Sequence, residues 1–266
     1  MSAELVLVFI VLGAFVGVMA GLLGIGGGGI LVPVLTTIFI HLNFPMHNVV
    51  HIALGTSMAC IMVTSFSSLR AHHANSAVVW SLVKVMSPAI IAGTFLATFL
   101  AAQTSSKALA IFFSIFMAYV ASQMFRNKKI HAGPGRAGKI ELSFVALGIG
   151  AISALVSIGG GSLTVPYLTW RNLDIRRAIG TSAALGFPIA VTGTLGYLIN
   201  GILSGASTGY TWGFVYLPAV LLITIPSFFT APVGARLTQK LPVQTLKRVF
   251  GVLLIVLSIK MLVSLL

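Results

Sequence analysis

Apolar residues fall into ten runs separated by short polar or basic stretches, and the order of these runs repeats once along the 266-residue chain. The first half holds runs at about 3–23, 30–42, 49–69, 78–102 and 108–125, and the second half holds runs at about 140–157, 163–170, 178–199, 212–235 and 249–266. Most runs approach or exceed the roughly 20 residues with which a helix crosses the apolar core of a bilayer. The pattern predicts an all-α polytopic membrane protein.

The second run of each half is too short to cross a membrane. The runs at 30–42 and 163–170 contain at most 13 residues, which cover about 20 Å of a core roughly 30 Å thick. We expect each to be a half-helix that returns toward the side from which the preceding helix came. Each half would then contain a hairpin of a broken helix and a half-helix, followed by three full transmembrane helices.

A glycine-rich phrase precedes each short run. The first copy reads Gly26-Gly27-Gly28-Gly29-Ile30-Leu31-Val32-Pro33, and the second, 133 residues later, reads Gly159-Gly160-Gly161-Ser162-Leu163-Thr164-Val165-Pro166. A glycine in a helix interior costs about 1 kcal/mol relative to alanine. At membrane depth, non-helical backbone is tolerated only where it is buried in protein or lines a cavity. The phrases therefore predict two helix breaks inside the protein.

A second phrase also occurs twice, as Gly55-Thr56-Ser57 and as Gly180-Thr181-Ser182. The two pairs of phrases divide the chain into a first membrane repeat at 1–125, a basic linker at 126–139 and a second membrane repeat at 140–266. A hairpin followed by three crossings leaves the chain on the opposite side of the membrane. We therefore expect the two repeats to have inverted topology.

Loop charges orient this arrangement. The linker 126–139 carries five basic residues and no acidic residue, so the positive-inside rule places it in the cytoplasm. Counting spans from the linker also places the basic loops at 70–84, 171–177 and 236–248 inside and the uncharged loops at 43–48 and 200–211 outside. Both termini are then expected outside the cell.

Composition excludes several other classes of protein. Hydrophobic residues make up 58% of the chain and charged residues 7%, against about 25% charged residues in soluble domains. The net charge of +13 comes from basic residues between apolar runs, so we expect the lipid bilayer, and not nucleic acid, as a partner. The acidic residues Glu4, Glu141 and Asp174 lie near the ends of runs, which leaves no mid-membrane carboxylate for a proton relay.

No enzymatic or metal-binding motif is present. The glycine run lacks the Gly-Lys-Ser/Thr ending of a nucleotide-binding loop, and we expect no catalytic residue, no cofactor and no enzymatic activity. Histidines such as His47 and His51 have no acidic or thiol companions, so no metal site is predicted. Whether the histidines take part in proton coupling, and whether Lys84 and Lys260 reach a membrane interface or attract an anion, stays open.

The helix breaks are the candidate substrate site. Gly29 and Ser162 suit the N-cap position, and Pro33 and Pro166 suit the first turn, where they would act as structural hinges. Free backbone N–H groups and the positive end of the helix dipole favour an anion. The predicted substrate-binding residues are Gly26, Gly27, Gly28, Gly29, Gly159, Gly160, Gly161 and Ser162, with the hydroxyls of Thr56, Ser57, Thr181 and Ser182. Close helix packing for the glycines, and hydroxyl bonds to a carbonyl one turn earlier, are the structural alternatives.

These paired phrases, each followed by Gly-Thr-Ser, resemble those of the sulfite exporter TauE/SafE family, and the resemblance covers nearly the whole chain. It implies a permease of the prokaryotic inner membrane for sulfur-containing anions such as sulfite, sulfoacetate or related sulfonates. Ser162 stands where the first copy has Gly29, which would make the two half-sites chemically unequal.

We expect export by alternating access, in which the two halves move around a central anion. An anion channel with the same donors, and a membrane anchor subunit that transports nothing, are the alternatives. The sequence does not decide which anion is carried, the direction, ion coupling or oligomeric state. Apolar outer faces suit lipid and a second copy of the chain equally, so a homo-oligomer also stays open.

Overall fold

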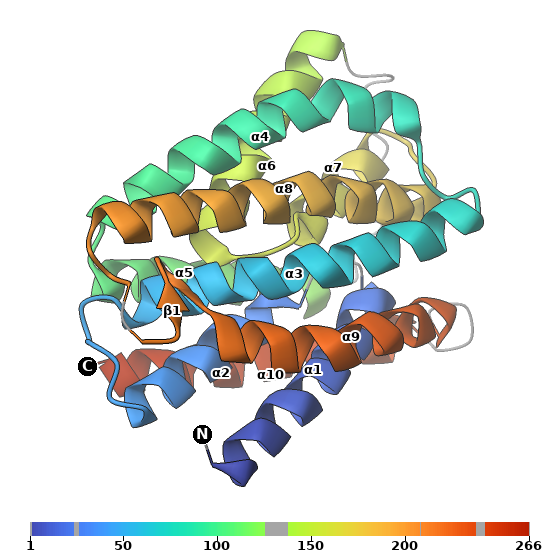
Figure 1. Cartoon of the computed structure of the whole chain (residues 1–266). Helices are drawn as coiled ribbons and strands as arrows, with labels where there is room; N and C mark the ends of the chain where they lie inside the picture. The colour runs from blue at the N-terminus through green and yellow to red at the C-terminus, as the bar shows by residue number, and fades with distance from the viewer. Residues whose placement is uncertain (1, 24–26, 126–137, 208, 238–242, 266) are drawn as a thin grey trace.

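The structure is a computed structural model that describes residues 2–23, 27–125, 138–207, 209–237 and 243–265. Within these ranges the chain forms ten helices and a short two-stranded hairpin (Figure 1). The elements are α1 (Ala3–Leu23), α2 (Gly28–His41), α3 (Val49–Ala74), α4 (Trp80–Gln103), α5 (Ser106–Phe125), α6 (Lys139–Val156), α7 (Gly161–Trp170), α8 (Ile175–Leu203), β1 (Thr211–Trp212), β2 (Val215–Tyr216), α9 (Leu217–Leu237) and α10 (Val243–Leu265). The predicted all-α class is confirmed.

Eight of the described helices are long and apolar enough to cross a membrane, and α2 and α7 are shorter, with 14 and 10 residues. The outer surface of the bundle is apolar. On α10, for example, Val252, Val256 and Ile259 are each more than half exposed and follow one another at helical spacing. Such a continuous apolar face suits lipid, and the protein is a polytopic membrane protein.

Both short helices return toward the end at which the preceding helix began. Near the start of α6, Glu141 accepts a hydrogen bond of 3.1 Å from the hydroxyl of Tyr167 on α7 and forms an ion pair with Arg171, the C-cap of α7. In the first half, Leu5 of α1 and Leu42, just after α2, line the same surface pocket. The predicted hairpins of a long and a short helix are therefore present in both halves.

Helices α3 and α8 form the centre of the bundle (Figure 1). They are the most buried of the long helices, with 83% and 67% of their apolar windows inside the protein. Met58 of α3 lies against Gly193 of α8, and Ser65 lies against Gly186, so these helices run in opposite directions. Inverted repeats require their counterpart helices to be antiparallel, and α3 and α8 meet this requirement. The inverted topology of the two complete repeats remains a prediction.

The two halves do not fold as separate packing units. Helix α1 packs on α9, and the counterpart pair α6 and α4 packs in the same way; similarly, α3 packs on α9 and α8 packs on α4. Figure 1 shows α4 beside α8 and α9 beside α3, on opposite sides of the central pair. The fourth helix of each half, α4 or α9, therefore packs mainly against helices of the opposite half.

The hairpin β1–β2 was not expected from the sequence. The loop predicted at 200–211 is shorter, because α8 continues to Leu203, and the chain then turns back at Gly213, whose φ is +53°. Thr211 pairs with Tyr216, and Trp212 pairs with Val215, in antiparallel register. Two-residue strands carry too little hydrophobic alternation to be recognised in a sequence.

Helix packing across the halves depends on glycines that leave no space for a side chain. A Cβ at Gly150 of α6 would clash with the backbone of Ile90 on α4, whereas a Cβ at Gly148, on the same helix, would meet nothing within 4 Å. We expect Gly150→Ala to destabilise the protein by about 1–3 kcal/mol through overpacking, and Gly148→Ala to be neutral or slightly stabilising.

Thermal unfolding of the two variants in the same detergent measures this difference. Equal melting temperatures for Gly150→Ala and Gly148→Ala would contradict the assigned packing.

Candidate functional site

The two helix breaks have the same backbone geometry. Gly27 and Gly160 are the N-caps of α2 and α7, and both have φ of +76°, in the left-handed region. The prediction that Gly29 and Ser162 are the N-caps is therefore wrong, since each helix begins earlier. The physical reason is that the turn into each helix needs a left-handed residue, which glycine adopts at no steric cost.

The prolines also lie deeper in the helices than predicted. Pro33 and Pro166 are each five residues after the first helical residue, Gly28 or Gly161, and so fall in the second turn and not the first. A proline there cannot donate to the carbonyl four residues earlier, which belongs to Gly29 in α2 and Ser162 in α7. Their role as hinges remains a prediction.

The break in the first half lies against the end of α6 in the second half. A Cβ at Gly28 would overlap the carbonyl oxygen of Ser157, the C-cap of α6. Ser157 is itself left-handed, with φ of +50°, and its hydroxyl donates to the carbonyl of Leu54 on α3 at 2.6 Å. Only glycine fits at position 28, because the α6 backbone, the α2 start and the middle of α3 meet there.

Helix geometry leaves the first N–H groups of α2 and α7 without intrahelical acceptors. In each helix the cap carbonyl, of Gly27 or Gly160, accepts from the third and fourth helical residues at 2.8–3.1 Å. The N–H groups of Gly28, Gly29, Gly161 and Ser162 make no hydrogen bond within the described part of the chain. These are donors at the positive ends of two helix dipoles, which is the arrangement that an anion requires.

Not every glycine of the phrases faces a potential ligand. A Cβ at Gly29 would lie 2.7 Å from Leu254 on α10 and 3.3 Å from Met117 on α5, so this glycine permits close helix packing. Gly160 faces Ile189 of α8 at 2.8 Å. Gly26 lies outside the described residues. The packing alternative therefore explains the absence of a side chain at Gly29 and Gly160. The N–H of Gly29 has no acceptor among the described residues, whereas the N–H of Gly160 donates to the carbonyl of Ile158 at 2.8 Å.

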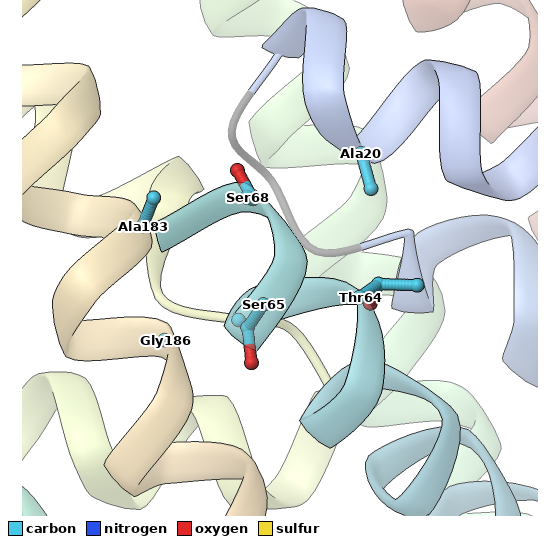
Figure 2. A pocket seen from close by; sticks show the side chains of 7 residues that line it. Ala20, Thr64, Ser65, Ser68, Ala183 and Gly186 are labelled. Atoms are coloured by element: carbon cyan, nitrogen blue, oxygen red, sulfur yellow. The ribbon is translucent and has the colours of Figure 1, made fainter. Parts of the chain in front are cut away.

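A small cavity lies beside the second break, between the two halves (Figure 2). It leaves about 10 Å³ for the centre of a water molecule, which is room for about one water. Ser65 and Ser68 of α3 line it. The hydroxyl of Ser65 donates to the carbonyl of Met62 at 3.2 Å, whereas that of Ser68 is buried without a partner in the described residues. The complete lining is Ala20, Thr64, Ser65, Ser68, Gly159, Ala183 and Gly186.

Of the predicted site residues that the structure describes, only Gly159 lines this cavity. The sequence reasoning missed Thr64, Ser65 and Ser68. A signal for them exists, because residues 64–68 place four hydroxyl side chains within two turns of a membrane-spanning helix. Intramembrane polar residues that face the protein interior are candidates for a pathway.

The Gly-Thr pairs have a structural role that neither predicted reading included. The hydroxyl of Thr56 accepts a hydrogen bond of 2.9 Å from the backbone N–H of Tyr216, and Gly55 lies directly against the carbonyl of Phe214. The α3 pair thereby fixes the segment that enters α9.

The second copy does the same for the first half. Thr181 accepts a hydrogen bond of 3.0 Å from the backbone N–H of Val79, and a Cβ at Gly180 would lie 2.6 Å from the carbonyl oxygen of Ala77. This segment enters α4. We name these two contacts the cross-half clasps. Ser57 and Ser182, the residues that follow, are fully buried, and their hydroxyls have no partner among the described residues.

The other polar candidates lie away from the cavity. Lys84 and Lys260 are exposed on the outside of the bundle, as expected of lysines that reach an interface. His51 is buried, and its Nε2 lies 3.0 Å from the carbonyl oxygens of Ala101 and Thr104, so it fastens the turn between α4 and α5. The described residues contain no group of three or more potential metal-binding side chains.

Comparison with known proteins decides the family. The sequence profile of the sulfite exporter TauE/SafE family matches residues 9–261. The chain belongs to this family. A Haemophilus influenzae member, described as a probable membrane transporter protein, is 35% identical over 257 residues, which cover 96% of this chain and 97% of the relative. No solved structure matches the chain.

More distant members of the family cover almost the same length. A Methanocaldococcus jannaschii protein with the same description is 28% identical over 258 residues, covering 95% of this chain and 94% of its own. YdhB of Bacillus subtilis, again described as a probable membrane transporter protein, is 24% identical over 238 residues. The protein is a membrane transporter of the TauE/SafE family.

The clasps allow a direct test of the threonine role. We expect Thr56→Val to destabilise the protein by about 1–3 kcal/mol, because it removes the hydroxyl that accepts a hydrogen bond from the buried N–H of Tyr216. Thr56→Ser keeps an acceptor at the same place and is the matched control. Thermal unfolding in detergent measures both, and a Thr56→Val protein as stable as Thr56→Ser would show that the contact contributes nothing.

Proposed function

We propose that the protein carries a small sulfur-containing oxyanion, such as sulfite or an organosulfonate, out of the cell through the prokaryotic inner membrane. The observation that carries the proposal is the cavity beside a glycine-capped helix start, at the seam of the two halves, with the unpartnered hydroxyl of Ser68 in its lining residues. Membership of a family named for sulfite export supports the substrate class. We propose no enzymatic step and no resident cofactor.

The chemistry of the site suits such an anion. A sulfite or sulfonate group presents several oxygens, each of which accepts hydrogen bonds from hydroxyl or backbone N–H donors. Ser68 on α3 and the N–H groups at the start of α7 are such donors. The described lining includes no charged side chain. Neutral donors would hold an anion without the strong charge pairing that slows its release.

The transport cycle that we propose is alternating access between two units that meet at the α3–α8 seam, each of which combines helices from both sequence halves. One unit comprises α1, α2, α3 and α9, and the other comprises α6, α7, α8 and α4. The cross-half clasps connect α9 to α3 and α4 to α8 within these units. The cavity lies between the units, because α3 contributes Ser65 and Ser68 and α8 contributes Ala183 and Gly186.

The present conformation would be a closed one in this cycle. A cavity with room for about one water is too small for a sulfonate group, so the α3–α8 seam must widen to admit substrate. With both termini outside and the basic loops inside, the inside-negative potential favours exit of an anion by about 2.3 kcal/mol per charge per 100 mV. Export then needs no coupling carboxylate in the membrane.

Uptake and counterflow in proteoliposomes test this function. We expect saturable flux of one or more members of a panel of sulfite, thiosulfate, sulfoacetate, taurine, sulfate and a carboxylate, and stimulation of labelled uptake by the same unlabelled anion inside. Single-channel currents would favour the channel alternative. A well-folded protein that moves none of these anions would favour the anchor subunit.

Ser68 should contribute to substrate affinity. Removal of a hydrogen bond to a charged ligand costs about 1.5–3 kcal/mol, or roughly 10- to 100-fold in affinity, so Ser68→Ala should raise the substrate concentration at half-maximal flux by that factor. Ser67→Ala is the matched control, because the hydroxyl of Ser67 donates to the carbonyl of Phe228 at 2.9 Å and does not line the cavity. Identical kinetics in the two variants would exclude Ser68 as a ligand.

A disulfide across the seam tests the moving units. The Cβ atoms of Ser65 and of a residue built at position 186 lie 3.7 Å apart, within the usual range for a disulfide. Cys60 is the single cysteine of the chain. In a Cys60→Ala background, Ser65→Cys with Gly186→Cys should lose transport on oxidation and regain it on reduction. Each single cysteine variant, treated with the same oxidant, is the control. Unchanged flux in the fully cross-linked protein would contradict opening at this seam.

A further inference from the structure

A second polar hollow opens at the ends of α3 and α9, one helical turn beyond the cavity. It encloses about 530 Å³ and is lined by Ser67, Arg70, Ala71, Ala74, Asn75, Phe228, Pro232 and Arg236. We name it the arginine groove. The hydroxyl of Ser67 donates to the carbonyl of Phe228, which holds the two helices together at this point.

The arginine groove concentrates positive charge. Arg70 and Arg236 are both exposed, and neither has an ion-pair or hydrogen-bond partner within the described residues. Two of the chain's carboxylates already have partners outside the groove. Glu141 pairs with Arg171, and Asp174 accepts hydrogen bonds from N–H groups in the first turn of α8. Two guanidinium groups therefore face one hollow whose lining contains no carboxylate.

The groove and the cavity lie at neighbouring positions of one helix. Ser68 lines the cavity, and Ser67 and Arg70 line the groove. Guanidinium groups bind oxyanions through paired N–H donors, and a patch of one charge raises the local concentration of the opposite ion. An oxyanion held between Arg70 and Arg236 would thus be close to the candidate transport site.

We propose that the arginine groove is an oxyanion-binding vestibule that collects substrate on the side predicted to be cytoplasmic, before the seam opens. This inference rests on the proposed function for its substrate. The groove itself predicts a ligand with a singly or doubly charged sulfonate-like or phosphate-like head. A neutral or zwitterionic compound would gain little from the pair of guanidinium groups.

The helix ends offer a competing explanation for the arginines. Arg236 lies in the last turn of α9, and cations there stabilise the negative end of a helix dipole. That role requires no ligand and no second arginine in the same groove. It predicts that oxyanions do not change the chemical accessibility of either guanidinium group, which distinguishes it from the vestibule.

Arginine labelling with phenylglyoxal, read by peptide mass spectrometry on the full-length protein, separates the two. The probe is methanesulfonate, with sodium chloride at equal ionic strength as the reference. In nanodiscs of neutral phosphatidylcholine, methanesulfonate at ten times its dissociation constant should slow labelling of Arg70 and Arg236 roughly tenfold, because only the unoccupied fraction reacts. Arg177, exposed in the first turn of α8, is the matched control and should label at an unchanged rate.

The outcomes separate the groove from transport. The vestibule would be overturned if methanesulfonate slowed the labelling of Arg177 as much as that of Arg70 and Arg236, or if it did not slow the labelling of Arg70 and Arg236. A second control uses nanodiscs of anionic phosphatidylglycerol. If Arg70 and Arg236 label slowly there and methanesulfonate slows them no further, a lipid headgroup is the ligand and the vestibule is overturned. Arg70→Gln with Arg236→Gln should raise the half-saturating concentration only for anion presented at this face. If methanesulfonate protects Arg70 and Arg236 from labelling but the protein transports none of the tested anions, the groove is an oxyanion site and the proposed transport is refuted.

Discussion

Backbone N–H groups in the interior of a membrane protein have little water to bind, so each one left without an acceptor costs several kcal/mol. The segments that enter α4 and α9 are not helical, so the N–H groups just before each helix find no acceptor within it. Thr181 and Thr56 supply one from the opposite half. Because Gly180 and Gly55 let the same segments approach closely, the fourth helix of each half packs against the other half. The intertwined packing of α1 with α9 and of α6 with α4 is consistent with this constraint.

The same constraint explains why some features were predictable from the sequence and others were not. Long apolar runs and two short ones after glycine phrases predict the helices, because a span and a half-helix differ in length. The exact start of α2 was mistaken, because a left-handed residue at Gly27 has no periodic signature. The clasps could not be predicted, since the partners of Thr56 lie 160 residues away, in a strand of two residues.

Glycine has distinct uses within one phrase, and the structure separates them by neighbour. Gly27 provides a left-handed turn, Gly28 admits the backbone of α6, and Gly29 admits side chains of α5 and α10. Only the backbone N–H groups of such residues can bind substrate. Packing and anion binding are thus not exclusive explanations, because a residue that removes its side chain to let another helix approach still presents its N–H at the helix start.

The division between neutral and charged donors follows from what a carrier must do. A site that is both buried and charged pays a large desolvation cost when empty and holds an anion too strongly when full. In the proposed carrier, guanidinium groups remain in the exposed groove, where water and salt screen them, and the buried cavity uses hydroxyl and backbone donors. The affinity for the anion then comes from the arrangement of neutral donors at the seam, and the arginine groove raises the local concentration of the anion at the surface. Moving an arginine into the cavity should therefore favour binding and slow release, whereas removing the surface pair should slow capture alone.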